Sequence, residues 1–580
     1  MKKYTADFET TTKEDDCRVW AYAISEIGNP DNFRYGTTID DFMEICANPK
    51  ENAVYYFHNL KFDGEFIIYW LLKNGFTFIN DKKERKDNTF TTLITDMGQF
   101  YAIEVYFKVS KSDHINKVKF LDSLKILNFS VEQIAKDFDL PISKLKIDYK
   151  AERPIGHQLT EDEVAYIRND VEIMSRALDI MFNEGLTKMT IASDALADYK
   201  KMCPNFNQLF PTLPNEIDAD IRQSYKGGFT YLNPAYRGKQ TGSGFVLDCN
   251  SMYPARMYYD LLPYGNPVYF TGKYEKDPLY PLYVQQLTCT FELKKGKIPS
   301  IQIKHNPFFK DTEYIESSDG LPVTLTLTSV DLELFLENYD IIGEINWGSG
   351  WKFMAMQGLF NGYIDKWTEK KIQAKKDGNS ALYRISKLCL NSLYGRFGLN
   401  PNSRKKMPIL STDGKGVEYE FGEKEIRKTV YIPVATFITS YARAYIIRSS
   451  QQIRDFSMKK YGYDAWIYND TDSIHCLLPM SDVEELSKTM DIDDYKLGSW
   501  KLESVFQKGK YLRSKCYIEE FDGELNVTVA GLPKRLGKYI NFDNFKIGFT
   551  TEGMDIEERK LTYKRVEGGV LLVDTDFTIK

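Results

Sequence analysis

The segment Y-N-D-T-D-S at Tyr468–Ser473 constrains the fold more than any other part of this 580-residue sequence. Strand-forming apolar residues flank it (AWIY and IHCLL), so we predict a hairpin with Asp470 and Asp472 at its tip. A turn by itself explains one aspartate, because the Asp side chain stabilises turns. The second aspartate exceeds that requirement and indicates a functional site.

The segment G-F-V-L-D-C-N-S-M-Y-P supplies a partner for this hairpin. Its residues Phe245–Leu247 are typical of a buried strand, which ends at Asp248. A turn that carries Ser251 and Tyr253 follows. We therefore expect Asp248 to stand at the end of a core strand.

A second group of acids lies in the N-terminal third. Asp7 and Glu9 alternate along a predicted strand and share a face, where like charges repel unless a cation lies between them. Asp63 follows in F-H-N-L-K-F-D-G, and Asp170 lies four residues after Tyr166 on a predicted helix face that points inward. Phosphodiester hydrolysis uses two hard cations held by carboxylates, and a tyrosine hydroxyl can orient the attacking water. The four carboxylates and Tyr166 therefore suit phosphodiester hydrolysis.

The pattern of apolar residues divides the chain into regions. The first ~185 residues alternate strand-like and helical runs, which is an α/β pattern. The clearest helix begins at Thr160, which forms a capping box with Glu163, and ends at Glu184-Gly185. Further on, we predict a strand-rich region from about Gly227, a helix over about 380–394, and a strand-rich region over about 430–530.

The predicted helix over 380–394 has an unusual polar face. Arg384, Lys387, Asn391 and Tyr394 are spaced by three or four positions and share that face. A polar helix face is usually only solvated. Two cations, an amide and an aromatic ring in this order suit a triphosphate followed by a base.

The N-terminal motifs resemble those of family B DNA polymerases with a proofreading exonuclease. Asp7-Phe8-Glu9, Asn59-x-x-x-Asp63 and Tyr166-x-x-x-Asp170 match the three exonuclease motifs in order. The segments D-T-D-S, D-C-N-S-M-Y-P and K-L-C-L-N-S-L-Y-G resemble the polymerase motifs, with Met252 where the family usually has leucine. Three short matches extend the resemblance, namely Tyr225-Lys226-Gly227-Gly228, Thr439-x-x-x-Arg443 and Lys515-Cys516-Tyr517.

Within that family, the chain is most similar to the protein-primed DNA polymerases of small Bacillus phages, the phi twenty-nine type. The chain is short, and about 130 residues separate Tyr253 from Lys387, which leaves room for an inserted subdomain. The resemblance implies processive synthesis, strand displacement, and nucleotide transfer to a primer 3′-OH or to a hydroxyl of a terminal protein.

The resemblance assigns roles residue by residue. The implied catalytic residues are Asp7, Glu9, Asp63, Lys144, Tyr166, Asp170, Asp248, Asp470 and Asp472. The implied metal ligands are Asp7, Glu9, Asp63, Asp170, Asp248 and Asp472. The implied dNTP-binding residues are Ser251, Met252, Tyr253, Lys371, Lys387, Asn391 and Tyr394. The implied DNA-binding residues are His58, Asn59, Phe62, Ser123, Leu124, Tyr225, Gly227, Gly228, Thr439, Arg443, Lys515 and Tyr517.

The implied fold class is multidomain α/β and α+β. An RNase H-like DEDDy 3′–5′ exonuclease domain precedes a right-hand polymerase domain with two insertions. The implied limits are 1–188 for the exonuclease, 189–259 and 431–529 for the palm, 260–357 for the insertion that contacts the terminal protein, 358–398 for the fingers, 399–430 for the insertion linked to strand displacement and processivity, and 530–580 for the thumb.

The resemblance also implies cofactors and partners. The cofactor is Mg²⁺, two ions per active site, with Mn²⁺ able to substitute. The partners are template–primer DNA, dNTPs and a terminal protein that forms a heterodimer with the polymerase before initiation. No apolar run of membrane-spanning length and no signal peptide is evident, so we expect a location in the cytoplasm of an infected bacterial host.

Charge and composition leave alternatives open. The net charge of −6 counts against nucleic-acid binding as a first guess, although basic residues cluster locally, as in Lys508–Lys515. The alternatives are a family B polymerase that uses ordinary nucleic-acid primers, an exonuclease with a degenerate polymerase half, a non-catalytic single-strand-binding or priming protein, and a reverse transcriptase. Intact D-T-D-S and N-S-L-Y-G argue against the degenerate polymerase, and the exonuclease motifs argue against the reverse transcriptase.

Overall fold

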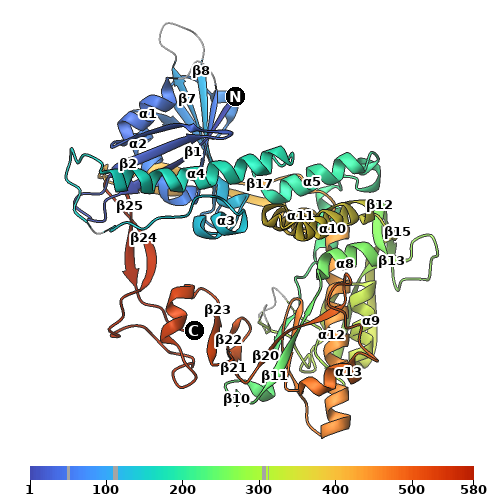
Figure 1. Cartoon of the computed structure of the whole chain (residues 1–580). Helices are drawn as coiled ribbons and strands as arrows, with labels where there is room; N and C mark the ends of the chain where they lie inside the picture. Colours follow the sequence, from blue (N-terminus) through green and yellow to red (C-terminus); the bar gives the residue numbers. More distant parts are fainter. Residues whose placement is uncertain (49–51, 109–114, 150, 304–307, 311–312) are drawn as a thin grey trace.

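The computed structural model describes residues 1–48, 52–108, 115–149, 151–303, 308–310 and 313–580. Figure 1 shows an N-terminal region around one large sheet, followed by helices α4 (Glu161–Asn183) and α5 (Ile191–Met202) that lead to a second region of helices and smaller sheets. Among the helices described, none combines the length and apolar character needed to cross a membrane.

The N-terminal region is built on a sheet with the strand order β3-β2-β1-β4-β8-β7-β6-β5. Strand β1 pairs antiparallel with β2 and parallel with β4. The bounds are β1 (Lys2–Thr10), β2 (Val19–Glu26), β3 (Asn29–Gly36), β4 (Ala53–Phe57), β5 (Thr77–Phe78), β6 (Thr89–Ile94), β7 (Phe100–Lys108) and β8 (Ile115–Asp122).

Helices cover both faces of this sheet. Residues Tyr22 and Ile24 of β2 belong to the core made with α1 (Ile39–Ala47) and α2 (Leu60–Lys73). Residue Ala23 of the same strand packs with α4 on the other face, because successive side chains of a strand point to opposite sides. On β1, Phe8 lies in the core of α1 and α2, so its two neighbours face α4.

Helix α4 confirms the predicted helix start. Thr160 is its N-cap, and the capping box with Glu163 is formed. Glu184 is the C-cap, and Gly185 adopts the left-handed conformation that ends many helices (φ 80°). The apolar residues Ile167, Val171, Met174, Leu178 and Met181 of this helix are buried.

A smaller sheet in the order β20-β11-β19-β18-β9 forms the centre of the second region. Strands β18 and β19 pair across a tight turn, so the predicted hairpin is confirmed. Helix α8 (Met252–Tyr259) follows β11 directly. The strand bounds are β9 (Thr230–Leu232), β11 (Gly244–Cys249), β18 (Trp466–Asp470), β19 (Ser473–Cys476) and β20 (Trp500–Phe506).

The prediction of a strand-rich region over 430–530 is wrong for its first part. Helix α12 (Ile432–Tyr461) occupies that part, and strands begin only at Trp466. The helix packs against α7, α8, α9, α11 and β12 and is buried around most of its circumference. A helix buried on all sides lacks the one-sided apolar stripe that identifies surface helices.

Two segments flank helices α10 (Asn361–Lys376) and α11 (Ser380–Phe397), at the positions of the two predicted insertions. Helix α11 matches the predicted helix over 380–394. The first insertion is a sheet in the order β12-β15-β13-β14 with helix α9 (Ser329–Asn338). Its strands are β12 (Leu262–Thr271), β13 (Leu282–Leu293), β14 (Val323–Thr328) and β15 (Tyr339–Met356). The second insertion is the hairpin of β16 (Asn402–Leu410) and β17 (Val417–Ile426).

The C-terminal part of the chain adds a sheet and a hairpin. The sheet has the order β10-β21-β22-β23, and β24 pairs with β25. The bounds are β10 (Gln240–Thr241), β21 (Lys508–Arg513), β22 (Cys516–Phe521), β23 (Glu524–Val529), β24 (Lys560–Val566) and β25 (Gly569–Thr575). The remaining helices are α3 (Val131–Asp137), α6 (Phe206–Leu209), α7 (Asn215–Arg222) and α13 (Val483–Leu486).

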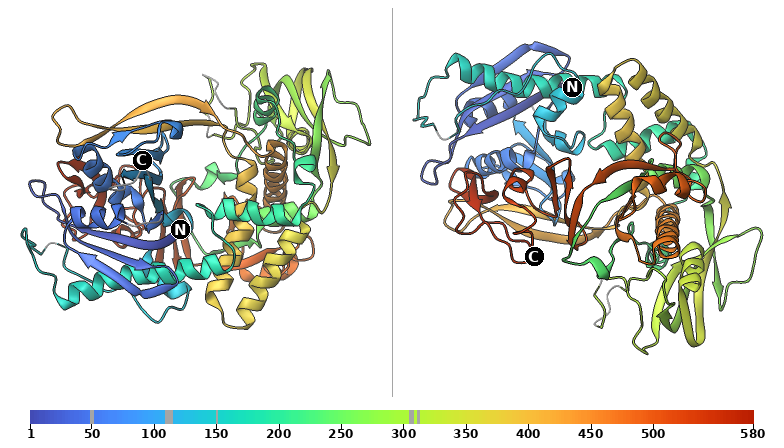
Figure 2. Two further views of the ribbon diagram at one scale, coloured as in Figure 1. Left: turned by 90° about the horizontal axis from the view of Figure 1, so that it is seen from above. Right: turned by 60° about the horizontal axis from the view of Figure 1, so that its bottom comes forward.

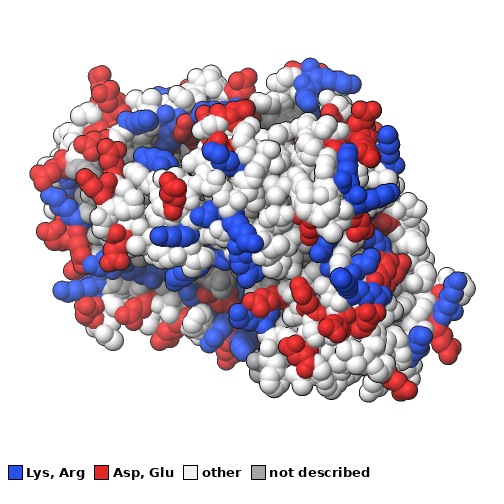
Figure 3. Space-filling model, turned by 90° about the horizontal axis from the view of Figure 1, so that it is seen from below, with Lys and Arg blue, Asp and Glu red and all other residues white. Residues whose placement is uncertain are grey.

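Two hairpins return from the second region to the N-terminal sheet. Figure 2 shows the β16–β17 hairpin spanning the molecule toward that sheet, where Lys405 forms a β-bridge with Thr95. The β24–β25 hairpin lies against α2. Basic and acidic side chains intermingle on the face seen in Figure 3, so any polyanion must be bound by local clusters rather than by overall charge.

Candidate active sites

Three carboxylates converge between the large sheet and α4. Asp7 and Glu9 lie on β1, and Asp170 lies on α4. One carboxylate oxygen of each lies within 4.8 Å of the others. The strand alternation that turns Phe8 toward the opposite core brings Asp7 and Glu9 to the same side as α4.

Asp63 joins this group from the first turn of α2. Its Oδ1 accepts a hydrogen bond from the backbone N–H of Phe8 at 3.2 Å, and the side chain is buried. Burial, followed by the charge of Asp7, raises the pKa of Asp63 well above its usual value. The backbone of β1 thus ties α2 to the three other carboxylates.

The electrostatics of the group favour bound cations. Burial, followed by the charge of Asp170, raises the pKa of Asp7 to about 7. Burial, followed by the charge of Asp7, raises the pKa of Glu9 well above its usual range. Buried carboxylates that repel one another in this way form an oxygen donor set that fits hard divalent cations.

Lys144 and Tyr166 border the acidic group. The Lys144 Nζ donates a hydrogen bond to Asp170 and another to the Tyr166 hydroxyl at 3.5 Å. The Tyr166 hydroxyl lies 2.6 Å from the Tyr149 hydroxyl. A cavity of about 140 Å³ lies beside them, and its lining includes Asp7, His58, Lys144 and Asp170.

The residues predicted to grip single-stranded DNA surround the start of α2. His58 lies 3.1 Å from the Ser123 hydroxyl through Nδ1 and 2.7 Å from the Phe129 carbonyl through Nε2. Asn59 adopts a left-handed conformation (φ 79°), and Phe62 lies one turn further along. Leu124 follows Ser123 in the short helical turn after β8.

A second acidic site lies at the hairpin of β18 and β19. Asp248 at the end of β11 is in register with Ser473, and the backbone N–H of Cys249 donates to the Asp472 carbonyl at 2.8 Å. Burial, followed by the charges of Asp472 and Glu503, raises the pKa of Asp248 to about 7. Burial, followed by the charge of Asp470, raises the pKa of Asp472. This pair also fits divalent cations.

Asp470 makes a different set of contacts. It accepts a hydrogen bond from the Lys515 Nζ at 2.5 Å and one from the Tyr468 hydroxyl at 3.2 Å. Tyr517 packs against Tyr468, with the ring centroids 5.2 Å apart. The K-x-Y segment at residues 515–517 is thereby held against the β18–β19 hairpin.

A pair of stacked tyrosines lies next to this site. Tyr253, on α8, stacks on Tyr394, on α11, with the ring centroids 4.2 Å apart. Ser251 precedes α8 in a left-handed conformation (φ 56°), and Met252 is buried. A Cβ at Gly228 would come within 2.9 Å of the Tyr253 hydroxyl, so this close approach requires glycine.

The polar face predicted on α11 is only partly present. Lys387 and Asn391 are exposed. Burial, followed by the charge of Lys387, lowers the pKa of Lys371, and the charge of Lys387 opposes the rise in the pKa of Asp248. Arg384 turns away instead and forms an ion pair with Asp137 of α3 at 2.6 Å. The prediction that Arg384 shares the phosphate-facing surface is therefore wrong.

Comparisons with known proteins identify the family of this chain. The profile of the family described as DNA polymerase type B, organellar and viral, matches residues 46–483. The chain belongs to this family. It is 45% identical to the DNA polymerase of Bacillus phage B103 over the full length of both chains. It is 43% identical to the DNA polymerase of Bacillus phage phi29 over 100% of this chain and 99% of that protein.

The fold of this chain also matches solved structures of Phi29 DNA polymerase. The Phi29 DNA polymerase complexed with primer–template DNA and incoming nucleotide substrates matches with a TM-score of 0.89 and 42% identity, over 100% of both chains. The predicted resemblance to the phi29 type, the fold class of exonuclease plus polymerase domains, and the enzyme class are confirmed. The chain is thus a type B DNA polymerase.

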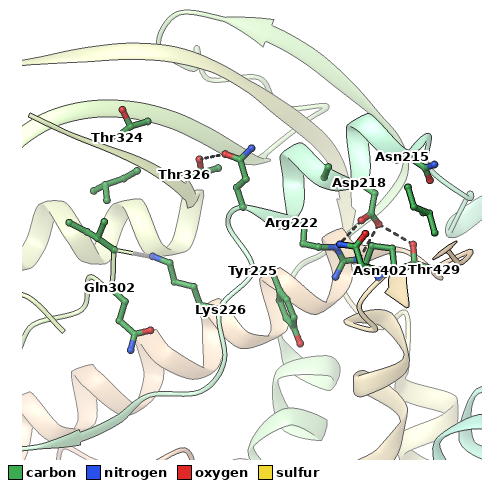
Figure 4. A pocket seen from close by; sticks show the side chains of 16 residues that line it. Asn215, Asp218, Arg222, Tyr225, Lys226, Gln302, Thr324, Thr326, Asn402 and Thr429 are labelled. Atoms are coloured by element: carbon green, nitrogen blue, oxygen red, sulfur yellow. Dashed lines mark hydrogen bonds and ion pairs between the residues drawn. The ribbon is translucent and has the colours of Figure 1, made fainter. Parts of the chain in front are cut away.

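In this polymerase, the Y-x-G-G segment crosses a cavity of about 660 Å³ between α7, the first insertion and the base of the second. Figure 4 shows Tyr225 and Lys226 among the residues that line this cavity. Asp218 accepts hydrogen bonds from Arg222 at 2.8 Å and from Thr429 at 3.0 Å. These contacts join α7, which precedes the Y-x-G-G segment, to the residues that lead into α12.

The predicted template contact of Thr439 and Arg443 does not fit this polymerase structure. Both side chains are buried. The Arg443 guanidinium donates to the carbonyls of Lys226 and Gly227 at 2.8 Å each and pairs with Asp331 at 2.6 Å. Arg443 therefore supports the Y-x-G-G segment from the interior, because α12 is a core helix.

Sequence reasoning missed several residues of the two sites. Asp122, buried at the end of β8, accepts hydrogen bonds from the backbone N–H groups of Asn59 and Leu124 at 3.0 Å each. An acid that ends an apolar strand is a signal that could have identified it. Glu503 lies on β20, beside the strand that ends at Asp248. Tyr149 contacts Tyr166, but nothing in its local sequence distinguishes it.

Proposed function

We propose that this polymerase extends a primer at Asp248 and Asp472 and removes misincorporated nucleotides at a separate site formed by Asp7, Glu9, Asp63 and Asp170. The observation that carries the polymerase assignment is the meeting of Asp248 on β11 with Asp472 in the turn of the adjacent β18–β19 hairpin, near the charge of Lys387. Both sites would hold Mg²⁺, with Mn²⁺ as a substitute, because both donor sets consist of carboxylates.

At the polymerase site, Asp248 and Asp472 would hold the ions, while Asp470 fixes the primer-side Lys515. The metal, when bound, neutralises the triphosphate and polarises the primer 3′-OH. Lys387, assisted by Lys371, would bind the phosphates, which the backbone N–H groups around Ser251 also face. We place Met252 and Asn391 among the dNTP-binding residues.

The stacked pair of Tyr253 and Tyr394 supports sugar and base selection. Tyr394 offers a ring to the incoming base pair, and Tyr253 blocks the position of a ribose 2′-hydroxyl. Gly228 permits this arrangement because it has no side chain there. Gly228, Tyr225 and Gly227 would face the template strand, and Tyr517 would face the primer strand.

At the exonuclease site, Tyr166 would orient the attacking water and Lys144 would approach the scissile phosphate. Lys144 lines the same cavity as Asp7 and Asp170, and its ammonium donates a hydrogen bond to the Tyr166 hydroxyl at 3.5 Å. The residues around the start of α2 would bind the unpaired 3′ end, namely His58, Asn59, Phe62, Ser123 and Leu124. Aromatic and polar groups of this kind bind single strands without sequence preference.

The partners follow from the relatives. The Phi29 structures contain primer–template DNA and incoming nucleotides, and we propose both for this chain. We further propose a terminal protein as primer, bound as a heterodimer before initiation, with the first insertion as a docking surface. Synthesis would take place in the cytoplasm of an infected bacterial host.

We propose domain limits that follow the elements. The exonuclease domain covers 1–188, and the palm covers 189–259 and 431–529. The insertions cover 260–357 and 399–430, which contain β12–β15 and β16–β17 respectively. The fingers cover 358–398, and the thumb covers 530–580.

The test uses one variant for each site. Asp472→Ala should abolish dNTP incorporation on a primed template and retain digestion of single-stranded DNA. Asp7→Ala combined with Glu9→Ala should abolish digestion and retain incorporation. Full incorporation by Asp472→Ala, or undiminished digestion by the double variant, would contradict the assignment of that site.

Priming is tested separately. Rolling-circle extension of a primed circle, compared with a linear template plus a candidate terminal protein, distinguishes protein priming from nucleic-acid priming. We expect activity in both reactions, with the label of the first nucleotide attached to the terminal protein. Extension of nucleic-acid primers alone would favour the alternative of an ordinary family B polymerase.

A further inference from the structure

The turn of the C-terminal hairpin is packed tightly against the exonuclease domain. A Cβ at Gly569 would come within 2.3 Å of the Phe66 ring, and one at Gly568 would come within 1.9 Å of the Cys17 carbonyl. Val570 and Leu571 belong to the apolar core that α1 and α2 form with the sheet. The hairpin is therefore part of the exonuclease structure, although it is distant in sequence.

A buried ion pair fixes the hairpin relative to α2. The Glu65 carboxylate is almost fully buried and lies 2.9 Å from both the Nε and the Nη2 of Arg565. The Tyr419 hydroxyl, from β17, donates to the same carboxylate at 2.9 Å. Glu65 lies two residues after Asp63 on α2, so this contact sets the position of β24 beside the start of that helix.

Tyr563 lies two residues before Arg565 and projects from the same face of β24. Its hydroxyl accepts a hydrogen bond from the Asn59 Nδ2 at 3.1 Å, and its ring centroid lies 6.2 Å from that of Phe62. The Lys61 Nζ lies 4.9 Å from the Tyr563 ring centroid. The side chain remains 38% exposed, so part of the ring can still receive a ligand.

This arrangement has the composition of a single-strand site. Non-specific binding of single-stranded DNA combines aromatic rings that stack on bases with cations that attract the backbone. Phe62 and Tyr563 supply two neighbouring rings, and Lys61 supplies the charge. Asn59 is held in its left-handed conformation by the Asp122 carboxylate, and its side-chain amide is held by Tyr563.

We propose that Tyr563 is a further binding residue of the exonuclease site and that the C-terminal hairpin contributes it. The ligand is the unpaired 3′ end of a DNA strand, whose penultimate bases lie against the Phe62–Tyr563 pair. This inference rests on the proposed excision role of Asp7, Glu9, Asp63 and Asp170. It adds that the exonuclease domain alone lacks part of its substrate site.

The test compares three variants of the full chain in Mg²⁺, namely Tyr563→Ala, Tyr563→Phe and Leu561→Ala. Leu561 is the matched control because it lies on the same face of β24 with 39% exposure. Digestion of 5′-labelled oligothymidylates of two to twelve nucleotides gives KM and kcat. Tyr563→Ala should raise KM for the longer strands roughly fivefold or more, with a smaller effect on the dinucleotide. Tyr563→Phe should keep most of the affinity, and Leu561→Ala should match the wild type.

Three outcomes would overturn the inference. Unchanged KM in Tyr563→Ala, while the wild type digests single strands, removes Tyr563 from the site and leaves the excision proposal intact. An equal loss for all lengths that falls on kcat, together with a lowered melting temperature, assigns Tyr563 a purely structural role. A wild type that digests no single strand contradicts the excision proposal itself, which is a distinguishable result.

Discussion

At the scale of single residues, both proposed sites bury acids that repel one another. Burial and neighbouring carboxylates raise the pKa of Asp7 and that of Asp248 to about 7 each. In the absence of a cation these groups destabilise the folded chain when they ionise. The chain therefore retains at these positions a local instability that the binding of divalent cations relieves.

The sign of this effect gives a prediction for the metal-free protein. A carboxyl group whose pKa rises from 3.8 to about 7 on folding binds more protons in the folded than in the unfolded state between those pH values. The free energy of unfolding should therefore fall as the pH rises from about 4 to about 7, and this contribution should stay constant above that range.

Asp7→Asn removes this repulsion. In EDTA at pH 8, we expect the variant to have a free energy of unfolding higher than that of the wild type by on the order of 1–3 kcal/mol, with a smaller difference at pH 5. Thermal unfolding at both pH values measures the difference in free energy of unfolding between variant and wild type. The control is Asp87→Asn, at an exposed loop position. A less stable Asp7→Asn protein at pH 8 would contradict the electrostatic account.

At the scale of elements, a buried ion pair joins helix α12 to helix α9. Burial raises the pKa of Asp331 on α9, but the Arg443 guanidinium outweighs burial and leaves that pKa below its usual value. The same guanidinium binds the carbonyls of the Y-x-G-G segment. One buried ion pair thus joins two helices and the linker.

Loss of one partner of this pair should destabilise the protein strongly. Asp331→Ala leaves the buried Arg443 uncompensated, so we expect a loss of about 3–5 kcal/mol in the free energy of unfolding. Replacement of both residues, Asp331→Leu with Arg443→Met, should recover most of that loss. Urea unfolding gives the values.

The same two helices provide the control. Glu337 of α9 and Arg448 of α12 form an exposed ion pair at 2.6 Å. Exposed pairs contribute little, so Glu337→Ala should change stability by less than about 1 kcal/mol. An equal loss in the free energy of unfolding for Asp331→Ala and Glu337→Ala would contradict the claim that burial makes the Asp331–Arg443 pair more important for stability.

At the scale of the whole molecule, Glu65 joins three parts of the chain. It belongs to α2, Tyr419 belongs to the second insertion, and Arg565 belongs to the C-terminal hairpin. Burial raises the pKa of Glu65, and the Arg565 guanidinium opposes this shift. This junction connects the two hairpins that return to the exonuclease domain (Figure 2).

We expect Glu65→Ala to weaken this junction by about 1.5–3 kcal/mol, since hydrogen bonds to a charged group are lost. Primer extension with a competitor DNA trap should then give shorter products, and the decrease should grow with salt. Glu132→Ala, at the exposed pair with Lys136, is the control. Products of wild-type length at every salt concentration would rule out a role of the junction in processivity.

Local spacing was sufficient to predict much of both sites. Asp7 and Glu9 share a strand face, Thr160 begins α4, and Asp470 and Asp472 lie at a hairpin, because each feature depends on neighbouring residues with fixed periodicity. The resemblance to the phi29 type then linked these segments into one enzyme class.

Features that depend on packing could not be predicted in this way. Helix α12 replaces the first part of the predicted strand-rich region, because contacts with distant parts of the chain bury most of its circumference and leave no one-sided apolar stripe. Arg384 and Arg443 were expected at ligands but pair with Asp137 and Asp331. Tyr563 contacts Asn59 because the C-terminal hairpin packs against the N-terminal domain. The burial of α12 and the partners of Arg384, Arg443 and Tyr563 depend on residues far away in the sequence. A local sequence pattern therefore cannot predict them.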